Sequence, residues 1–253
     1  DNASWWEHLL LSIPMCLNLG LSGIPFVGAD AGGFQFDTDP ELLTRWTQLG
    51  TFIPFFRNHS AVDTCRQEPY LLDDPYKSIC RGFIKLRYRL IPYIYTMMHE
   101  AATSGTPIMR PLVLEFPEDP KTHGIFDQFM LGPSIMVAPV YQPETKCRQV
   151  YLPKGEWLDL YTHKVIAGNR YVLGDAPLEK IPVFLREGAI IPMGREMHFV
   201  GEQEQTLGII DICPSRNARS GKFSLYVDDG ETEQYRAGHF GFIHISYAAT
   251  QDG

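Results

Sequence analysis

The sequence lacks a long hydrophobic run and has no excess of basic residues. No apolar stretch approaches the roughly 20 residues that a membrane-spanning helix needs, so we expect no membrane segment. There are 22 Lys and Arg against 30 Asp and Glu, which leaves a net charge of −8. Nucleic-acid binding depends on a basic face that displaces counterions, so this charge argues against such a partner. A neutral or cationic substrate is compatible with it.

Paired cysteines are missing as well. The five cysteines lie far apart and contain no CxxC motif: Cys16, Cys65, Cys80, Cys147 and Cys213. An odd and scattered set predicts neither a zinc site nor a disulfide framework. We therefore expect no metal and no cofactor. Unpaired thiols favour a reducing compartment such as the cytoplasm, although they do not determine the location.

An initiator methionine and a signal segment are also missing. The chain begins at Asp1 and ends at Gly253 in a polar stretch, and we interpret it as a piece of a longer protein. Its 253 residues are 44% hydrophobic and 21% charged. This length and composition predict a packed core, in one large domain or two smaller ones.

The first 108 residues predict helices that alternate with short buried strands. Helices are expected over Trp5–Leu19, from Asp39-Pro40 to Gly50, and from Asp74-Pro75 to about Gly105. The middle helix begins with a capping carboxylate and a proline at the first helical position, and a glycine ends it. The apolar runs Ile24–Val27 and Phe52–Phe56 predict the strands.

After Pro107 the pattern changes to short apolar runs separated by Gly and Pro. These runs are Val113–Phe116, Ser134–Val137, Gln149–Leu152, Trp157–Tyr161, Pro182–Leu185, Ala189–Pro192, Leu207–Ile212 and Phe223–Val227. Short strands with turn residues between them are typical of an all-β sandwich. Some aromatic residues here could either pack in the core, which we favour, or form a sugar-binding patch. They are Trp157, Tyr161, Tyr171 and Phe184.

Polar residues follow directly after the two predicted strands of the first part. Asp30 follows the first strand, and Arg57 and His59 follow the second. Asp1, Asp30 and His59 are equally spaced, 29 residues apart. A (β/α)8 barrel spends about 31 residues on each strand–helix unit, so these three side chains are expected at one rim of such a barrel. Coincidental spacing is the alternative.

These residues suit the chemistry of sugars. Glycoside hydrolysis requires a carboxylic acid that protonates the leaving oxygen and a second carboxylate that attacks or stabilises the sugar cation. Asp1 and Asp30 are the candidate carboxylates, and Arg57 and His59 are candidate donors to sugar hydroxyls. Phe34 can pack on the apolar face of a sugar ring. Ordinary structural interpretations stay open: a turn aspartate, an Asp30–Arg57 pair that only stabilises the fold, and a loop histidine.

An ordered set of motifs along the chain resembles glycoside hydrolase family 31, the family of α-glucosidases. In the first part these are residues 1–9 (DNASWWEHL), 27–34 (VGADAGGF), 45–50 (RWTQLG), 54–59 (PFFRNH) and 86–88 (LRY). In the second part they are residues 110–112 (RPL), 132–140 (GPSIMVAPV), 181–192 (IPVFLREGAIIP) and 225–230 (LYVDDG). Each motif is weak alone, but their order over most of the chain makes the set specific.

The resemblance implies a retaining, exo-acting α-glycosidase that releases glucose from the non-reducing end of α-glucosides or α-linked oligosaccharides, without a cofactor. The implied fold is α/β followed by all-β. It comprises the C-terminal part of a (β/α)8 TIM barrel over residues 1–108, a β-sandwich over 109–194 and the start of a second β domain over 195–253. A homo-oligomer is compatible with the resemblance, and no nucleic-acid or membrane partner is expected.

By resemblance, Asp1 occupies the position of the family's acid/base, and Asp30 that of a carboxylate in the subsite for the non-reducing sugar. His59 matches the histidine that hydrogen-bonds this sugar, and Phe34 matches an aromatic residue of the pocket wall. Arg57 lies in the family's Arg-Asn-His run and orients Asp30. The family's nucleophile, an Asp in a Trp-x-Asp-Met motif, is absent from this sequence. We therefore expect the chain alone to be inactive.

Two alternatives stay open. The same fold serves α-xylosidases, α-galactosidases and sulfoquinovosidases, which differ in the sugar that they accept. The second alternative is a non-catalytic carbohydrate-binding homologue. Such a protein would carry a non-acidic residue at the acid/base or nucleophile position, and Asp1 argues against it.

Overall fold

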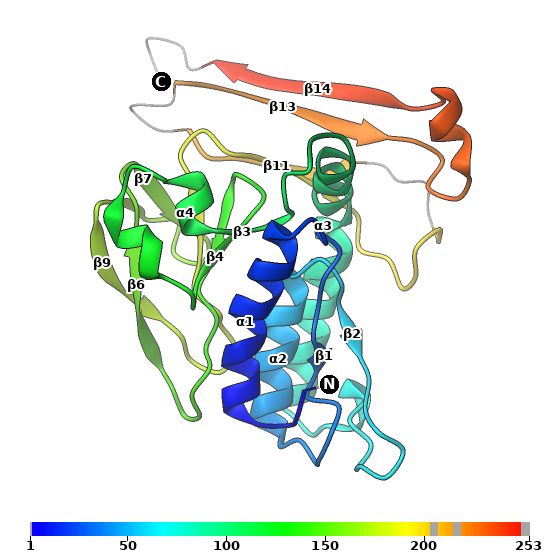
Figure 1. Cartoon of the computed structure of the whole chain (residues 1–253), viewed down its shortest axis with the longest axis vertical. Helices are drawn as coiled ribbons and strands as arrows, with labels where there is room; N and C mark the ends of the chain where they lie inside the picture. The colour runs from blue at the N-terminus through cyan, green and yellow to red at the C-terminus, as the bar shows by residue number, and fades with distance from the viewer. Residues whose placement is uncertain (1, 203–206, 215–218, 249–253) are drawn as a thin grey trace.

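The computed structural model describes residues 2–202, 207–214 and 219–248. Its three long helices stand side by side, a β-rich body lies beside them, and a long hairpin crosses one end (Figure 1). The helices are α1 (Trp6–Leu21), α2 (Pro40–Phe52) and α3 (Tyr76–Ser104). None of the described helices has the length and hydropathy needed to span a bilayer.

Local sequence signals set two of the helix ends. The Asp39 carboxylate caps α2 by accepting a 2.9 Å hydrogen bond from the backbone N–H of Leu42, and Pro40 takes the first helical position. Gly105 ends α3 in the left-handed conformation, with a φ of 77° that glycine adopts without steric cost. Both ends agree with the prediction from the sequence.

The strands of this part differ from the prediction. The runs Ile24–Val27 and Phe52–Phe56 are not strands, and Phe52 belongs to α2. The ladder is instead made by β1 (Asp30–Ala31) and β2 (Arg57–Asn58), which pair in parallel. Each predicted run contains a proline, which has no N–H to donate to a ladder. Regular pairing therefore starts past the prolines, at the polar residues.

Three segments nevertheless lie next to one another in parallel order. Ala3 forms a parallel bridge with Gln35, and the N–H of Ser4 donates to the Gln35 carbonyl over 2.8 Å. β1 in turn pairs in parallel with β2. One helix follows each segment, in the order α1, α2 and α3. This repeat of parallel segment and helix is part of a (β/α)8 barrel, as predicted.

The β-rich body contains a six-stranded antiparallel sheet in the order β3-β4-β5-β10-β7-β8. These strands are β3 (Met109–Pro111), β4 (Phe129–Leu131), β5 (Ile135–Val137), β7 (Glu156–Asp159), β8 (Val165–Ala167) and β10 (Val183–Arg186). A separate antiparallel pair consists of β6 (Cys147–Leu152) and β9 (Arg170–Asp175). The two layers share a hydrophobic core.

Successive residues of the central strands face two different cores. Phe129 and Leu131 of β4 join the core that includes the helices, whereas Met130 between them joins the core shared with β6. β5 and β10 alternate in the same way. Side chains of a strand point to opposite faces in turn, so a sheet covered on both faces has continuously apolar strands. This explains the unbroken apolar runs and confirms the predicted β-sandwich.

One predicted strand is helical. The run Val113–Phe116 belongs mostly to α4 (Leu112–Glu115), a single helical turn. The turn keeps Glu115 close to Arg110, and their charged groups lie 2.7 Å apart. An extended chain would carry the glutamate away from this arginine. The strand prediction is wrong because a partly buried ion pair, which the pattern of apolar residues does not reveal, favours the turn.

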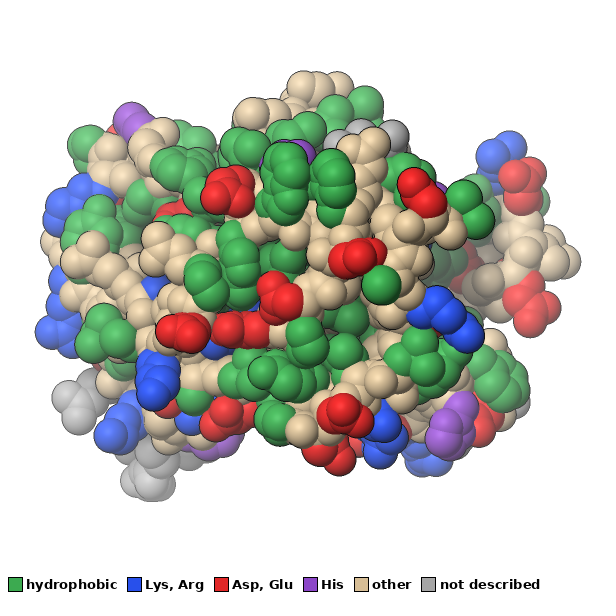
Figure 2. Space-filling view, turned by 90° about the horizontal axis from the view of Figure 1, so that it is seen from below, with side chains coloured by type: hydrophobic (Ala, Val, Ile, Leu, Met, Phe, Trp, Pro, Cys, Tyr) green, Lys and Arg blue, Asp and Glu red, His purple; other side chains and the backbone are tan. Residues whose placement is uncertain are grey.

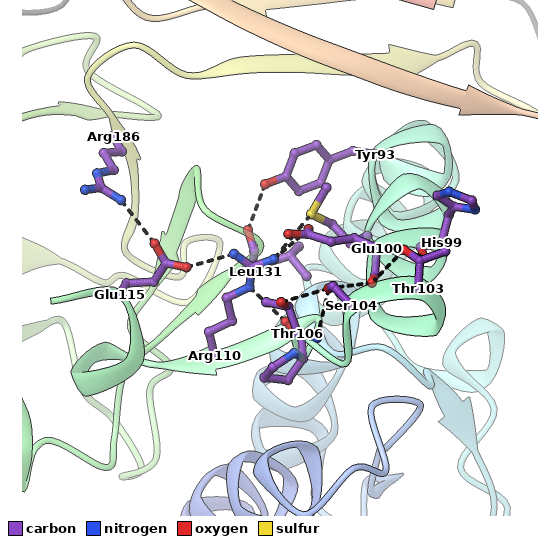
Figure 3. A network of polar contacts seen from close by, with 12 residues as sticks. Tyr93, His99, Glu100, Thr103, Ser104, Thr106, Arg110, Glu115, Leu131 and Arg186 are labelled. Atoms are coloured by element: carbon purple, nitrogen blue, oxygen red, sulfur yellow. Dashed lines mark hydrogen bonds and ion pairs between the residues drawn. The ribbon is translucent and has the colours of Figure 1, made fainter. Parts of the chain in front are cut away.

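Arg110 joins α3 to the β-rich body (Figure 3). Its guanidinium pairs with Glu100 of α3 and with Glu115 of α4, each at 2.7 Å, and its Nε donates to the Pro107 carbonyl. Glu115 also pairs with Arg186 of β10 at 3.2 Å. The Arg110 side chain is 5% exposed. Removal of either glutamate would therefore leave a buried charge that is only partly compensated.

Arg45 makes a second joint, between α2 and loops of the β-rich body. It is almost completely buried, and burial lowers the pKa of its guanidinium, an effect that Glu41 and Glu179 oppose. It donates to the backbone carbonyls of Thr145, Ala176, Pro177 and Lys180. Arg45 lies in one of the motifs that carry the family resemblance, and these contacts give that motif a structural role.

The remaining strands form two hairpins. β11 (Ile190–Gly194) pairs with β12 (Leu207–Ile212), and β13 (Ser220–Val227) pairs with β14 (Gly241–Ala248). α3 contacts both β11 and β13. The expected domain boundary at residue 195 falls in the connection between β11 and β12. Short 3-10 helices lie at η1 (Pro69–Leu71), η2 (Pro120–Gly124) and η3 (Glu233–Ala237).

Candidate active site

The Asp30 carboxylate lies at the centre of the candidate site. Asp30 is the first residue of β1 and is 7% exposed. Arg57 of β2 donates to its Oδ1 from Nε at 2.8 Å and from Nη2 at 2.5 Å. Among the described residues, hydrogen bonds to this carboxylate reach Oδ1 alone. Oδ2 is therefore available to accept a hydrogen bond from a ligand.

His59 and Phe34 lie beside this carboxylate. His59 Nδ1 is 3.7 Å from Asp30 Oδ1, and the ring centroids of His59 and Phe34 are 5.0 Å apart. Arg57 also lies over the Phe55 ring, at 5.3 Å from its centroid. About half of the Arg57 and His59 side-chain surface is exposed. The structure thus brings together Asp30, Phe34, Arg57 and His59, four residues that the sequence singled out.

Asp1, the fifth residue singled out by the sequence, lies outside the described residues. Its neighbour Asn2 is placed by two hydrogen bonds of 2.9 Å. The Asn2 Nδ2 donates to the Asp30 carbonyl, and the Asn2 carbonyl accepts the N–H of Phe34. Asn2 therefore fixes the N-terminal segment against the backbone of both Asp30 and Phe34.

Gln67 holds the two halves of the cluster together, a role that sequence reasoning missed. This residue is 5% exposed. Its Nε2 faces acceptors on both halves, the carbonyls of Ala31 at 3.1 Å and Gly33 at 3.2 Å and the Oδ1 of Asn58 at 3.1 Å. Asn58 in return donates from Nδ2 to the Gln67 carbonyl at 2.9 Å. One side-chain amide thus ties the loop that carries Asp30 to the loop that carries His59.

The role of Gln67 depends on contacts with residues that are distant in the sequence, so it could not be predicted from the sequence. It lies in an irregular stretch before η1, outside any apolar periodicity, and 36 residues separate it from Ala31. The Gln67 Oε1 has no hydrogen-bond partner among the described residues, although the atom is buried. An orphaned acceptor of this kind costs about 1–3 kcal/mol, so the donors on the opposite side of the amide must compensate for it.

Two glycines allow the backbones around the site to approach closely. A Cβ at Gly28 would lie 1.9 Å from the Phe55 carbonyl oxygen. A Cβ at Gly33, where φ is 95°, would lie 2.4 Å from the Ser4 nitrogen. Any side chain at either position would push neighbouring parallel segments apart, because these distances are shorter than van der Waals contact.

A hollow of about 320 Å³ opens beside Asp30 and Arg57. Asn2 and side chains of α1 also line it. Burial raises the pKa of one of these, the Cys16 thiol, to about 11, so the thiol stays protonated and unreactive near neutral pH. Within residues 2–202, 207–214 and 219–248, no group of His, Cys, Asp and Glu side chains is arranged to hold a metal ion.

The end of the molecule nearest the N-terminus carries mixed side chains. Figure 2 views the protein from this end and shows acidic side chains spread over the face, with basic ones mainly towards its margins. This distribution agrees with the net charge of −8. A polyanionic ligand would be repelled by such a face, whereas a neutral ligand would not.

The cluster is chemically suited to bind a ligand with several hydroxyl groups. Asp30 accepts hydrogen bonds, Arg57 donates them, and His59 does either according to its tautomer. Phe34 offers an aromatic ring next to these polar groups. Cleavage of a glycosidic bond requires a pair of carboxyl groups. Asp30 is the one carboxylate of this cluster, and it is paired with Arg57, so cleavage would need a further carboxyl beside it.

Two family models match the sequence. Residues 1–97 match the glycosyl hydrolases family 31 TIM-barrel domain. Residues 105–191 match the glycosyl hydrolase family 31 C-terminal domain.

Named proteins are similar over nearly the whole chain. Alpha-glucosidase 2 of Bacillus thermoamyloliquefaciens is 41% identical over 98% of this chain, which covers 31% of that protein. Neutral alpha-glucosidase AB of Homo sapiens is 40% identical over 93% of the chain, which covers 25% of that protein. The chain therefore spans about a quarter to a third of the length of these curated relatives.

Solved structures show the same extent of similarity. A family 31 dextranase of Flavobacterium johnsoniae has a TM-score of 0.90 and 35% identity, over 96% of this chain and 31% of that one. A family 31 alpha-xylosidase of Xanthomonas citri has a TM-score of 0.90 and 32% identity, over 98% of this chain and 28% of that one.

Proposed function

Because the chain belongs to glycoside hydrolase family 31, we propose that it forms part of a retaining, exo-acting α-glucosidase. Asp30, Phe34, Arg57 and His59 hold the terminal, non-reducing sugar in this proposal. The observation that carries it is one nearly buried carboxylate with an arginine and a histidine beside it, on adjacent parallel segments. Active sites of parallel barrels are built from residues at the carboxyl ends of several strands and from the loops that follow them.

Each side chain has a distinct part in binding. Arg57 holds Oδ1 of Asp30, so the carboxylate is fixed in orientation, and Oδ2 accepts a hydroxyl of the sugar. His59 donates to or accepts from a neighbouring hydroxyl, and Phe34 limits the pocket on the side of its ring. Fixed polar groups of this kind lose little conformational entropy when the sugar binds.

Asp1 is the proposed acid/base. It would protonate the glycosidic oxygen as the leaving group departs and then take a proton from the water that releases the sugar. Retention requires a second carboxylate, about 5–5.5 Å from the first, that attacks the anomeric carbon and forms a glycosyl-enzyme intermediate. We propose that a part of the protein beyond these 253 residues supplies this nucleophile, since the chain spans only 31% of a relative such as alpha-glucosidase 2.

An assay with identification of the anomer tests this function. The complete gene product is expected to hydrolyse 4-nitrophenyl α-glucoside and to release glucose first as the α-anomer, which proton NMR distinguishes. Initial release of the β-anomer would exclude the retaining mechanism. Failure to hydrolyse any α-glycoside would favour the non-catalytic homologue. The 253-residue chain alone is expected to be inactive, and measurable hydrolysis by it would refute the assignment of a missing nucleophile.

An α-xylosidase is the second candidate, because the Xanthomonas citri alpha-xylosidase aligns as well as the dextranase does, with a TM-score of 0.90. An α-xyloside lacks the hydroxymethyl group of an α-glucoside, so the two activities differ in a small part of the pocket. Comparison of kcat/KM on 4-nitrophenyl α-glucoside, α-xyloside and α-galactoside separates them. A preference of about tenfold or more for one substrate would identify the sugar.

A further inference from the structure

The β-sandwich carries a second hollow, of about 420 Å³, which shares no lining residue with the hollow beside Asp30. Residues 124–128 and Tyr171 of β9 line it, together with residues between 139 and 149. In Figure 1, β6 and β9 lie on the opposite side of α1 and α2 from β1 and β2. The hollow therefore belongs to the sandwich, and it has the size of an ordinary small-ligand site.

Aromatic rings stand exposed at this hollow. Tyr171 is 50% exposed and Phe126 is 53% exposed, although both are large apolar rings. Of the aromatic residues considered for a sugar patch, Trp157 and Phe184 are buried in the core, whereas Tyr171 faces solvent. Exposed aromatic rings that line a hollow are available to pack against the flat face of a ligand.

The charged groups of the hollow neutralise each other. Its charged lining residues are Asp127 and Arg148, which form an ion pair at 2.7 Å. Tyr141 donates its hydroxyl to Asp127 Oδ2 at 2.7 Å, and the Arg148 guanidinium lies over the Tyr141 ring at 5.1 Å. Arg148 also donates to the Pro139 carbonyl, and its side chain is 9% exposed. The floor is thus rigid and carries no net charge.

Other polar lining residues are neutral, namely Gln142, Thr145 and Gln149, whereas the Gln128 amide is buried and bonded to the Tyr151 backbone. The Asp127 carboxylate would repel an anionic ligand, and the Arg148 guanidinium would repel a cationic one. The ion pair therefore favours neither kind of charged ligand. A neutral ligand with many hydroxyls can use the amides and Asp127 as partners and place its C–H face on the exposed rings. This combination of neutral hydrogen-bonding groups and flat rings fits a sugar.

We propose that this hollow is a secondary carbohydrate-binding site that takes a short stretch of an α-glucan chain. Tyr171 and Phe126 pack against the faces of the sugar rings, and the neutral amides hydrogen-bond the hydroxyls. The choice of an α-glucan as the sugar rests on the proposed function. A site of this kind would hold a long substrate on the enzyme while an exo-acting pocket removes its terminal residues, which raises the local concentration of chain ends.

Cyclic glucans test the proposal without interference from the active site. β-Cyclodextrin and cycloisomaltoheptaose are rings of α-1,4- and α-1,6-linked glucose that have no non-reducing end, so an exo-acting pocket cannot accept them. Isothermal titration calorimetry of the complete gene product is expected to show one site for at least one of the rings. Tyr171→Ala and Phe126→Ala should each weaken binding about tenfold, the equivalent of a lost ring contact.

Matched variants separate the hollow from general surface effects. Tyr171→Phe keeps the ring and should bind like wild type, and so should Tyr235→Ala, which removes an exposed tyrosine from η3. Thermal unfolding checks that each variant is folded. The proposal is overturned if neither cyclic glucan binds to wild type, or if binding survives both alanine substitutions. Absence of glucosidase activity in wild type would reject the proposed function instead, and the titration would still report on this site.

Discussion

The candidate active site and the β-sandwich are held together by different interactions. Around Asp30 the strands pair over two residues each, and the amides of Gln67 and Asn2 complete the hydrogen bonding. In the sandwich, Trp157 and Phe184 are buried between two layers. Burial of such a side chain contributes about 1.5–3 kcal/mol. A neutral hydrogen bond contributes about 0.5–1.5 kcal/mol net.

This difference separates stability from function. The sandwich core gains stability from apolar burial, which is large in sum and non-directional. The site depends on a few directional contacts that are weak in free energy, so small displacements should matter for ligand binding more than for folding. Arg110 and Arg45 couple the two regions, because both arginines are buried at the joint between the helices and the β-rich body.

The largest effect on stability is expected for Trp157→Ala. Trp157 is 0% exposed and its Nε1 donates to the Pro153 carbonyl at 2.8 Å. Its removal leaves a cavity and an unpaired carbonyl, so the free energy of unfolding should fall by about 3–5 kcal/mol in urea titrations. Phe199→Ala, at a 58% exposed position, should change it by less than about 0.5 kcal/mol. If Trp157→Ala lowered the free energy of unfolding by no more than Phe199→Ala does, the sandwich core would not be a main source of stability.

Asp30→Asn is expected to lower activity strongly while it changes stability little. The substitution keeps the shape but removes the charge that accepts from the sugar, and a hydrogen bond to a charged group is worth about 1.5–3 kcal/mol. The kcat/KM on the preferred 4-nitrophenyl glycoside should therefore fall about 100-fold. Stability should change by less than about 1 kcal/mol, because the Arg57 partner is 47% exposed.

Asp175→Asn is the matched control for Asp30→Asn. Asp175 also pairs with a cation, Lys180 at 3.1 Å, but it lies at the end of β9 in the sandwich and is 65% exposed. The Asp175→Asn substitution should leave kcat/KM at the wild-type value. If both substitutions lowered activity equally, the site would not be centred on Asp30.

Gln67→Glu should lower the free energy of unfolding and raise KM, and both effects should depend on pH. The new carboxyl keeps the shape of the amide but faces acceptors on Ala31, Gly33 and Asn58, so it can serve them only when protonated. Burial and these acceptors raise its pKa in the folded state above the ordinary value of about 4.3. The destabilisation should thus be small near about pH 4 and increase as the pH rises, to about 1–3 kcal/mol.

Gln128→Glu controls for the burial of a carboxyl. Gln128 is 2% exposed, and its Nε2 donates to the Tyr151 carbonyl at 2.7 Å within the sandwich. Both variants should lose stability as the pH rises, but only Gln67→Glu should also raise KM, and this KM should recover at low pH relative to wild type. An unchanged KM in Gln67→Glu would show that Gln67 stabilises the fold without positioning the sugar site.

Much of the fold was predictable because its signals are local. The Asp39 cap and the Gly105 terminus are visible within one helical turn. The strand positions at Ile24–Val27 and Phe52–Phe56 were predicted wrongly, because apolar composition does not report which N–H groups find partners, and in the first run only Val27 is buried. The turn at Leu112–Glu115 was missed for a similar reason, since Arg110 acts through a side-chain contact.

The site was predictable only in part. Asp30, Arg57 and His59 could be singled out because they follow apolar runs, and Asp1, Asp30 and His59 because they are spaced 29 residues apart, which is visible in the order of residues. Gln67 could not, because its partners lie up to 36 residues away and belong to loops with no periodicity. The exposed ring of Tyr171 was likewise indistinguishable in sequence from the buried ring of Trp157.

The order of residues alone was enough to predict the succession of helical and β-rich parts, the ends of two helices and the polar residues that follow the apolar runs. These features depend on neighbours in the chain, whose chemistry is visible in the order of residues. The approach of Arg57 and His59 to the Asp30 carboxylate, and the link that Gln67 makes between their loops, depend instead on how the chain folds. Hydrogen bonds and ion pairs between distant segments depend on positions within a few ångströms, which folding alone fixes.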